Sequence, residues 1–245
     1  MVRIYKHRTP PASLETEKEK KSGKYNLPDV SRQLVRDEAD KCYICEISVA
    51  SGFQVEHRIG HNGGEHTDLK FSWDNLHQSC PHCNSVKNQK KYATGLLDCC
   101  KTDPEQEVCQ RIRMAAITVT PRTDTEAAAT TADLIRECLF STSTFQKAHN
   151  SAFRRREIKL RTISLCKKLR RYRDLRDTRD PEDPDRREAF REVCGMISSK
   201  AEFSAFLRTF VRDRLDEFPE FTEYVGAWTE QNTEAQAASA TGVQE

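Results

Sequence analysis

The chain has 245 residues, of which 36% are apolar and 32% are charged, so it can form one sizeable domain or two small ones. A formal net charge of +2 does not by itself indicate a nucleic-acid-binding protein. No run of about 18 apolar residues occurs and no apolar signal segment opens the chain, so we expect no membrane span and a cytoplasmic location. Ten cysteines in such a chain favour reduced thiols and metal binding over disulfides.

The N-terminal part is predicted to begin with an extended arm. Residues 1–28 contain two adjacent prolines and a dense run of charges, which is typical of an extended segment rather than a packed element. A short helix is predicted over residues 29–40, where Asp29 can cap the first turn. Val30 and Leu34 provide its apolar stripe.

The next part of the chain predicts a strand, a loop, a short strand and a helix. Apolar and polar residues alternate over residues 53–59, which indicates a strand. Glycines mark residues 60–70 as a flexible loop. A second short ordered segment is expected over residues 71–76, and a helix is expected to begin within residues 84–92.

The C-terminal half is predicted to be mainly helical. Residues 130–140 and 144–172 lack internal prolines and have apolar residues at helical spacing. The proline-containing segment 180–185 ends the longer helix. A capping box beginning at Ser199 precedes another apolar helix, and a last short helix is expected over residues 221–228.

Two cysteine pairs bracket a stretch that contains five of the seven histidines. The pairs have C-x2-C spacing and consist of Cys42, Cys45, Cys80 and Cys83. Four thiolates at this spacing can close a tetrahedral Zn²⁺ site. Such a site would pull the strand that carries His57 against the start of the helix that carries Asn84, so a base and an amide ligand would meet at one spot.

Three segments in this region resemble the motif of the HNH, or ββα-metal, endonucleases. They are Val55-Glu56-His57, Trp73-Asp74-Asn75-Leu76 and Cys80-Pro-His-Cys83-Asn84-Ser-Val-Lys87. The resemblance covers about residues 41–91 and implies an α+β fold, in which a zinc-stapled ββα-metal core carries an appended mainly α-helical domain. More loosely, the chain resembles the HNH subunit of Septu and retron-associated antiphage systems. That likeness implies an ABC/SMC-like ATPase subunit as a partner.

The resemblance and the side-chain chemistry together imply three catalytic roles. His57 would be the general base, because an ordinary imidazole titrates near about pH 6.5 and can accept a proton from water. Asn75 would hold the backbone near His57 and orient its ring. Lys87 would contact a phosphate of the substrate.

A catalytic Mg²⁺ or Mn²⁺ ion is implied in the same way. Glu56, Asn84 and His82 are the expected ligands. Many HNH sequences have Asp or His in place of Glu56, so Asp68 or Asp74 is an alternative source of the carboxylate.

A basic run in the long helix has two interpretations. Residues 154–179 contain twelve Lys or Arg against three acidic residues, which fits either a solvated helix face or a track for phosphates. We favour the track. Its expected nucleic-acid contacts, together with Lys87, are Arg154, Arg155, Arg156, Lys167, Lys168, Arg170 and Arg171.

Other cysteines and histidines are expected to be secondary. Cys99, Cys100 and Cys109 could serve as alternative zinc ligands, although they lack C-x2-C spacing. His61, His66 and His77 are expected to be loop residues or to support the site.

These patterns predict four segments and one main function. The segments are an extended arm (1–28), an HNH nuclease domain with a four-cysteine zinc site (29–103), a helical domain (104–229) and a disordered tail (230–245). The expected function is metal-dependent hydrolysis of phosphodiester bonds in DNA, or in RNA such as tRNA, as the effector of an antiphage complex. The alternatives are a stand-alone restriction or homing-type HNH nuclease and a non-catalytic zinc-dependent nucleic-acid-binding adaptor.

Overall fold

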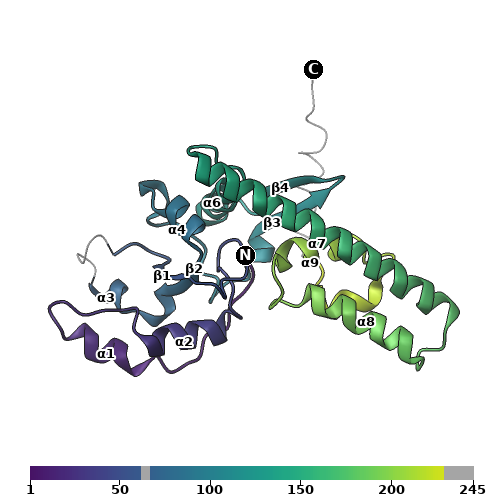
Figure 1. Ribbon diagram of the computed structural model, residues 1–245, viewed down its shortest axis with the longest axis horizontal. Helices are drawn as coiled ribbons and strands as arrows, with labels where there is room; N and C mark the ends of the chain where they lie inside the picture. Colours follow the sequence, from purple (N-terminus) through teal and green to yellow (C-terminus); the bar gives the residue numbers. More distant parts are fainter. Residues whose placement is uncertain (62–66, 229–245) are drawn as a thin grey trace, which may run out of the picture.

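The structure, a computed structural model, describes residues 1–61 and 67–228 and has the predicted α+β class (Figure 1). The helices are α1 (Ala12–Lys18), α2 (Pro28–Asp37), α3 (Thr67–Lys70), α4 (Pro81–Lys87), α5 (Pro104–Glu107), α6 (Glu126–Phe140), α7 (Phe145–Thr178), α8 (Pro184–Ile197), α9 (Ser204–Arg212) and α10 (Thr222–Val225). The strands are β1 (Gln54–His57), β2 (Leu76–Ser79), β3 (Val108–Arg113) and β4 (Ala116–Pro121). Short 3-10 turns are η2 (Trp73–Asn75), η3 (Lys90–Tyr92) and η4 (Pro219–Phe221). The predicted tail and the centre of the predicted loop, which contains His66, lie outside the described residues.

β1, β2 and α4 form a small unit, with α3 and η2 between the two strands in the chain. The two strands pair antiparallel, with His57 opposite Leu76. β2 begins at the end of the predicted segment 71–76, because η2 occupies the residues directly before it. α4 starts directly after β2, and its first turn is capped by the Cys80 sulfur, which accepts the backbone N–H of Cys83 at 3.4 Å. The cap fixes the direction in which the helix leaves the sheet.

A small apolar core lies between this unit and the first two helices. Its buried members are Leu14, Val30, Leu34, Phe71, Trp73 and Leu76. α2 begins one residue before the predicted helix 29–40 and ends three residues before the predicted end, and it buries Val30 and Leu34, as its apolar stripe predicted. The core therefore ties the strands that carry the candidate site to the N-terminal helices.

The N-terminal arm is packed, so the prediction of an extended arm over residues 1–28 is wrong. Met1 and Ile4 are buried in the main core, and Leu14 of α1 is buried in the smaller one. The backbone N–H of Ile4 also donates to the carbonyl of Cys99 at 2.8 Å. The apolar residues of the arm are too widely spaced to produce a periodic pattern, whereas its charges are conspicuous in the sequence.

The β3–β4 hairpin was not predicted. The strands pair antiparallel with Ile112 opposite Ile117, and Ile117 and Val119 alternate inward along β4. The turn is formed by Met114 and Ala115, with φ angles of 43° and 66°. Asn or Gly is the usual occupant of such positive-φ turn positions, so the sequence lacks the ordinary signal of a tight hairpin.

The long helix α7 runs along the C-terminal half and packs against α6, α8 and α9 (Figure 1). It ends before the proline-containing segment 180–185, as predicted. That segment also begins α8, which was not predicted. The carboxylate of Asp183 accepts the backbone N–H groups of Asp185 and Arg186 and so caps the new helix.

The predicted capping box at Ser199 is not used. α9 begins after Phe203, which has a left-handed φ of 53°, and no side chain caps the helix. Glu202 accepts the backbone N–H of Ser48 at 2.7 Å and pairs with Arg161 instead. The segment before α9 therefore connects the cysteine region to the helical region.

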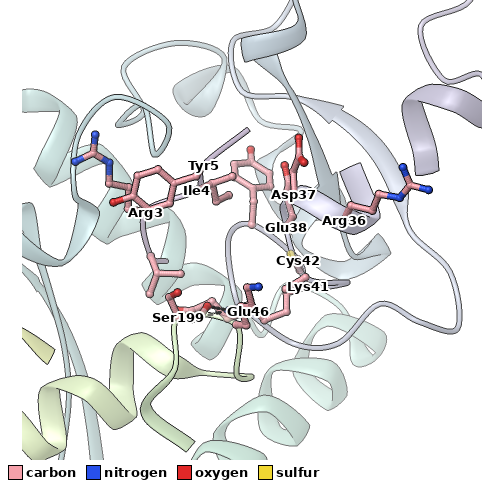
Figure 2. Close-up of a pocket in the computed structure, with 14 residues that line it drawn as sticks. Arg3, Ile4, Tyr5, Arg36, Asp37, Glu38, Lys41, Cys42, Glu46 and Ser199 are labelled. Carbon is pink, nitrogen blue, oxygen red and sulfur yellow. Dashed lines mark hydrogen bonds and ion pairs between the residues drawn. The ribbon is translucent and has the colours of Figure 1, made fainter. Parts of the chain in front are cut away.

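A buried ion pair completes this connection (Figure 2). The Lys41 Nζ lies 3.4 Å from a Glu46 carboxylate oxygen and donates to the carbonyls of Ser199 at 2.6 Å and Ala201 at 2.9 Å. Ser204 also donates to Glu46. Burial opposes the charge of Glu46, but the N-terminal amine and Lys41 more than offset it and lower the pKa of Glu46 to about 2. One apolar core runs from the cysteine cluster into the helices, so the described chain packs as a continuous unit.

None of the described helices is both long enough and apolar enough to cross a membrane.

Candidate metal centre and adjoining pocket

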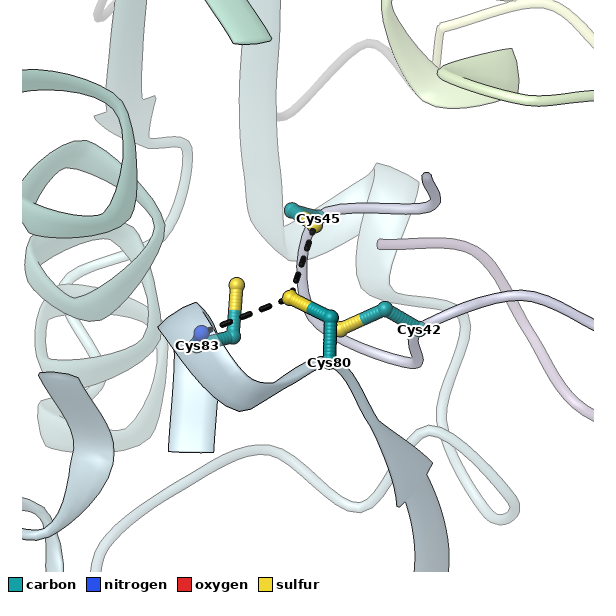
Figure 3. Close-up of side chains that lie close together, drawn as sticks. All are labelled: Cys42, Cys45, Cys80 and Cys83. Carbon is teal, nitrogen blue, oxygen red and sulfur yellow. Dashed lines mark hydrogen bonds between the residues drawn. The ribbon is translucent and has the colours of Figure 1, made fainter. Parts of the chain in front are cut away.

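The four predicted zinc ligands come together (Figure 3). Cys42 and Cys45 lie in the turn after α2, and Cys80 and Cys83 lie at the start of α4. All four sulfurs are within 4.8 Å of one another, and the Cys45 and Cys80 sulfurs are 3.9 Å apart. The turn is closed by a Glu46 N–H bond to the Cys42 carbonyl at 2.8 Å. This buried four-cysteine group can hold a zinc ion.

The surroundings of the sulfurs also fit a metal. Burial raises the pKa of the Cys42 and Cys83 thiols well above their usual range. Four thiolates would therefore not persist at neutral pH without a cation among them. The donor set consists of four soft sulfurs, which is a set that Zn²⁺ prefers.

Arg154 of α7 is part of this centre. Its side chain is 5% exposed, and its Nη2 donates to the Cys80 sulfur at 2.9 Å. Burial opposes its charge, but the sulfurs of Cys45, Cys83 and Cys80 more than offset this and raise its pKa. The prediction that Arg154 contacts nucleic acid is therefore wrong, and its role is to balance the negative charge of the sulfurs.

A pocket of about 410 Å³ lies beside the four-cysteine cluster, at the junction of β1 and α4. Four predicted site residues line it, together with His61, which was expected to lie in the loop or to support the site, and with further side chains that were not predicted for it. The predicted ones are Glu56, His57, Asn84 and Lys87, and the others include Tyr25, His61 and Lys90. The arrangement collects a carboxylate, an imidazole and an amide at one cavity, as the spacing of the motif implied.

His57 is held in one orientation at the pocket. Its Nε2 donates to the Lys70 carbonyl at 3.0 Å, so Nδ1 is the nitrogen that keeps its lone pair. The Tyr25 and His61 rings pack against it, with centroids 4.4 and 4.5 Å away. Burial lowers the pKa of His57 to about 4, rather than the ordinary value expected from the sequence. The ring is therefore neutral at pH 7.

Asn75 has the supporting position that was expected of it. Its Oδ1 accepts the Ile59 N–H at 2.8 Å, and its Nδ2 donates to the carbonyls of Ile59 and Leu69 at 3.0 Å each. These bonds fasten the chain that leaves β1 to the chain that precedes η2. Asn75 thus fixes the backbone on the C-terminal side of His57.

Glu56 and Lys87 form an ion pair across the pocket. The Lys87 Nζ lies 2.8 Å from the Glu56 carboxylate and also donates to the His57 carbonyl at 2.8 Å. The Lys87 side chain is only 4% exposed. It therefore joins α4 to β1, a different role from the predicted contact with a substrate phosphate.

His82 does not belong to the pocket, in contrast to its predicted role as a ligand of the catalytic metal. Its Nε2 bonds to the Cys138 carbonyl of α6 at 2.8 Å, and Ser151 of α7 lies 3.5 Å away. His82 and Asn84 point in different directions because they are two residues apart on a helix. Of the alternative carboxylates, Asp68 pairs with Lys18 at 3.1 Å and is largely exposed.

The remaining basic residues of α7 divide into two groups. Arg155 donates to the Leu139 carbonyl, Arg156 pairs with Glu157, and Lys168 and Arg171 both pair with Glu192. Lys167 and Arg170 are exposed and form no ion pair with any described residue. Glu192 of α8 thus neutralises part of the predicted track.

Three of the side chains at the two sites, Tyr25, His61 and Arg154, could not be assigned their contacts from the sequence. Tyr25 lies in the segment interpreted as an arm, and no motif marks it. His61 was expected to lie in a loop, and only the clustering of histidines pointed to it. Arg154 was one of many basic residues, and only its contact with α4 distinguishes it.

The chain matches no protein-family model, no curated protein and no solved structure. Its function must therefore be argued from the side chains themselves.

Proposed function

We propose that the protein is a metal-dependent endonuclease of the HNH type. The observation that supports this is the convergence of Glu56, His57 and Asn84 on one pocket next to the four-cysteine cluster. Two of the four cysteines, Cys80 and Cys83, lie at the start of α4, and Asn84 follows Cys83 directly. Zinc at the cluster would thus fix the helix that carries one side of the pocket to the strands that carry the other.

Each pocket residue has a defined task in this proposal. The lone pair on Nδ1 of His57 accepts a proton from the attacking water, and the Nε2 bond to Lys70 keeps the ring in place. The oxygens of Glu56 and Asn84 would hold Mg²⁺ or Mn²⁺, which prefer oxygen ligands. When bound, the ion supplies positive charge beside the phosphate oxygens. Lys87 competes for Glu56 through its ion pair and so sets the resting position of that carboxylate.

Substrate contact is proposed for the exposed basic residues only. Lys167 and Arg170 of α7 have no acidic partner in the described part of the chain, and Lys90 lines the pocket itself. Nothing in these residues distinguishes DNA from RNA, because phosphates are common to both. An ABC/SMC-like ATPase subunit and a role in antiphage defence stay predictions from the sequence resemblance.

The decisive experiment compares His57→Ala with His149→Ala, an exposed histidine on α7. Supercoiled plasmid and tRNA are incubated with the purified zinc-loaded chain and Mn²⁺. We expect the parent and His149→Ala to cut at least one substrate, and His57→Ala to lose on the order of 100-fold or more in rate. Cleavage by His57→Ala at the parental rate would contradict the proposal.

A binding measurement separates the nuclease from the adaptor without relying on cleavage. Mn²⁺ bound at the pocket is detected by electron paramagnetic resonance in the parent and in Glu56→Gln. We expect one site that is lost in the variant, with zinc content unchanged. Absence of Mn²⁺ binding in the parent, combined with intact nucleic-acid binding, would favour the zinc-dependent adaptor.

A further inference from the structure

A second group of metal-binding side chains lies apart from the four-cysteine cluster and from the pocket. It consists of His77, Cys99 and Cys100, whose ligand atoms are all within 4.8 Å of one another. His77 is on β2, and the two cysteines lie in the loop before α5. His77 and Cys99 are fully buried, and Cys100 is partly exposed.

The His77 ring is oriented as a metal ligand would be. Its Nδ1 lies 2.8 Å from a carboxylate oxygen of Glu38, whose second oxygen accepts the backbone N–H of Gln78 at 2.8 Å. The Tyr43 ring stacks on it with centroids 4.6 Å apart. A histidine that ligates a metal usually gives its other ring nitrogen to a carboxylate in this way.

The other ring nitrogen of His77 is the feature that calls for a ligand. Nε2 is buried and has no hydrogen-bond partner among the described residues. Buried polar atoms in folded proteins are almost always paired, so an orphaned nitrogen on a ring that lies beside two thiols needs an explanation. In a histidine that only fills the core, both ring nitrogens would have hydrogen-bond partners, or one nitrogen would face apolar atoms. The ring of His77 lies beside two thiols instead.

The two cysteines are held in place by their backbones. The Cys99 carbonyl accepts the N–H of Ile4 at 2.8 Å, and the Cys100 N–H donates to the Asp98 carboxylate at 3.0 Å. The loop is therefore fixed against the N-terminal segment before any ion binds. Ligand atoms around zinc are roughly 3.5–4 Å apart, so closing the group requires side-chain shifts of about 1 Å.

We propose that His77, Cys99 and Cys100 bind a second Zn²⁺ ion, with its fourth position open to solvent beside Cys100. Two thiolates and one imidazole form a soft donor set that selects zinc over magnesium or calcium. Glu38 is the positioning residue, because it fixes the ring of His77 and leaves Nε2 free to bind. The ion would fasten β2 to the loop before α5. This proposal is independent of the proposed nuclease activity.

Metal analysis of the full chain tests the proposal. Protein purified with reductant and excess zinc, then freed of unbound metal, is expected to hold two zinc ions per chain. Cys100→Ala and Cys100→Ser should each hold one, with an unchanged circular dichroism spectrum. Cys166→Ala, which removes an exposed cysteine of α7, should still hold two. One zinc ion in the parent, or two in both Cys100 variants, would overturn the proposal.

Two further measurements distinguish the alternatives. In a chelator competition, Glu38→Gln is expected to lower the affinity of the His77 site for zinc about 10-fold or more. The affinity of the four-cysteine site should be unchanged. Thiols are also counted in denatured protein that was never reduced. A disulfide between Cys99 and Cys100 would appear as two missing thiols and would overturn the proposal.

Discussion

At the scale of single residues, the pocket is defined by how His57 is buried. The ring is 5% exposed and contacts Tyr25 and His61, so its protonation is costly. The sequence could predict that His57 matters, because it follows an acidic residue on a strand. The burial depends on Tyr25, which comes from a different part of the chain and carries no motif.

The lowered pKa of His57 makes stability depend on pH. In the unfolded chain the imidazole titrates near about 6.5, whereas in the folded chain the pKa is about 4. The contribution of His57 to stability is therefore complete above about pH 6.5 and is lost as the pH falls through about 4, by on the order of 3 kcal/mol. Urea unfolding between these values, without added Mg²⁺ or Mn²⁺, should show a shallower pH slope for His57→Gln than for the parent. His149→Gln is the control and should keep the parental slope; equal slopes in all three proteins would refute the prediction.

Asn75 provides a second test at this scale. Asn75→Ala removes three hydrogen bonds at a side chain that is 3% exposed, and it leaves backbone groups of Ile59 and Leu69 without partners. We expect a loss of about 3 kcal/mol in the free energy of unfolding. Asn84→Ala removes one exposed bond to Gln54 and should cost less than about 0.5 kcal/mol. Similar losses in the two variants would show that Asn75 is not a structural fastener.

At the scale of elements, Arg154 couples α7 to the cysteine end of α4. Arg154 reaches from α7 to the sulfur of Cys80. With four thiolates around Zn²⁺ the cluster carries a net negative charge, and Arg154 is the positive group that the structure places against it.

Removing the guanidinium of Arg154 should weaken the binding of zinc at the four cysteines. In Arg154→Met the thiolates lose their charged partner, so transfer of zinc to a colorimetric chelator is expected to be about 10-fold faster or more. Arg156→Met, which removes an exposed arginine two residues away, should release zinc at the parental rate. Equal release rates in the two variants would exclude the charge-balancing role.

The basic face of α7 can be tested by a matched pair of double variants. Lys167→Gln with Arg170→Gln removes two charges that have no acidic partner among the described residues, whereas Lys168→Gln with Arg171→Gln removes two that pair with Glu192. If α7 contacts phosphates, the first pair should reduce the slope of log affinity against log salt by about 1.8. The second pair should have a smaller effect. If neither double variant changes the slope of log affinity against log salt, α7 does not contact phosphates and its role is structural.

How much could be predicted from the sequence also differs between elements. The first strand, α2, α6 and α7 follow from the spacing of their apolar residues. The β3–β4 hairpin could not be predicted, because Met114 and Ala115 occupy a turn that Asn or Gly usually marks. α8 was missed because its capping residue, Asp183, lies between two prolines that indicate a break. The four cysteines and the residues around His57 were found because short motifs fix their spacing, whereas Arg154 and His77 depend on contacts between distant segments.

At the scale of the whole molecule, the cysteine turn is buried against the helices and is not an independent module. Lys41 and Glu46 flank it. Lys41 donates to two carbonyls of the segment before α9, and Glu46 accepts the hydroxyl of Ser204, the first residue of α9. The metal centre, the N-terminal segment and the C-terminal helices therefore share one buried polar junction.

Breaking this junction should destabilise the entire chain. Lys41→Met leaves Glu46 and two carbonyls without their buried cation, at a cost of about 3–5 kcal/mol. Lys101→Met removes an exposed ion pair with Asp98 and should change stability by less than about 0.5 kcal/mol. The measurement is urea unfolding followed both by circular dichroism and by zinc release. Unfolding of the helices without loss of zinc would show that the two regions are separable.

The shortness of α4 has a physiological consequence. Its seven residues and the N-cap Cys80 supply two sulfurs at one end and two pocket side chains, Asn84 and Lys87, further along, so the helix separates the four-cysteine cluster from the pocket of His57. Oxidants or zinc starvation would act first on the sulfurs, yet the disturbance would reach Asn84 and Lys87 within a single helical turn. Metal supply and redox state in the surroundings are thereby expected to tune a cavity that contains no cysteine of its own.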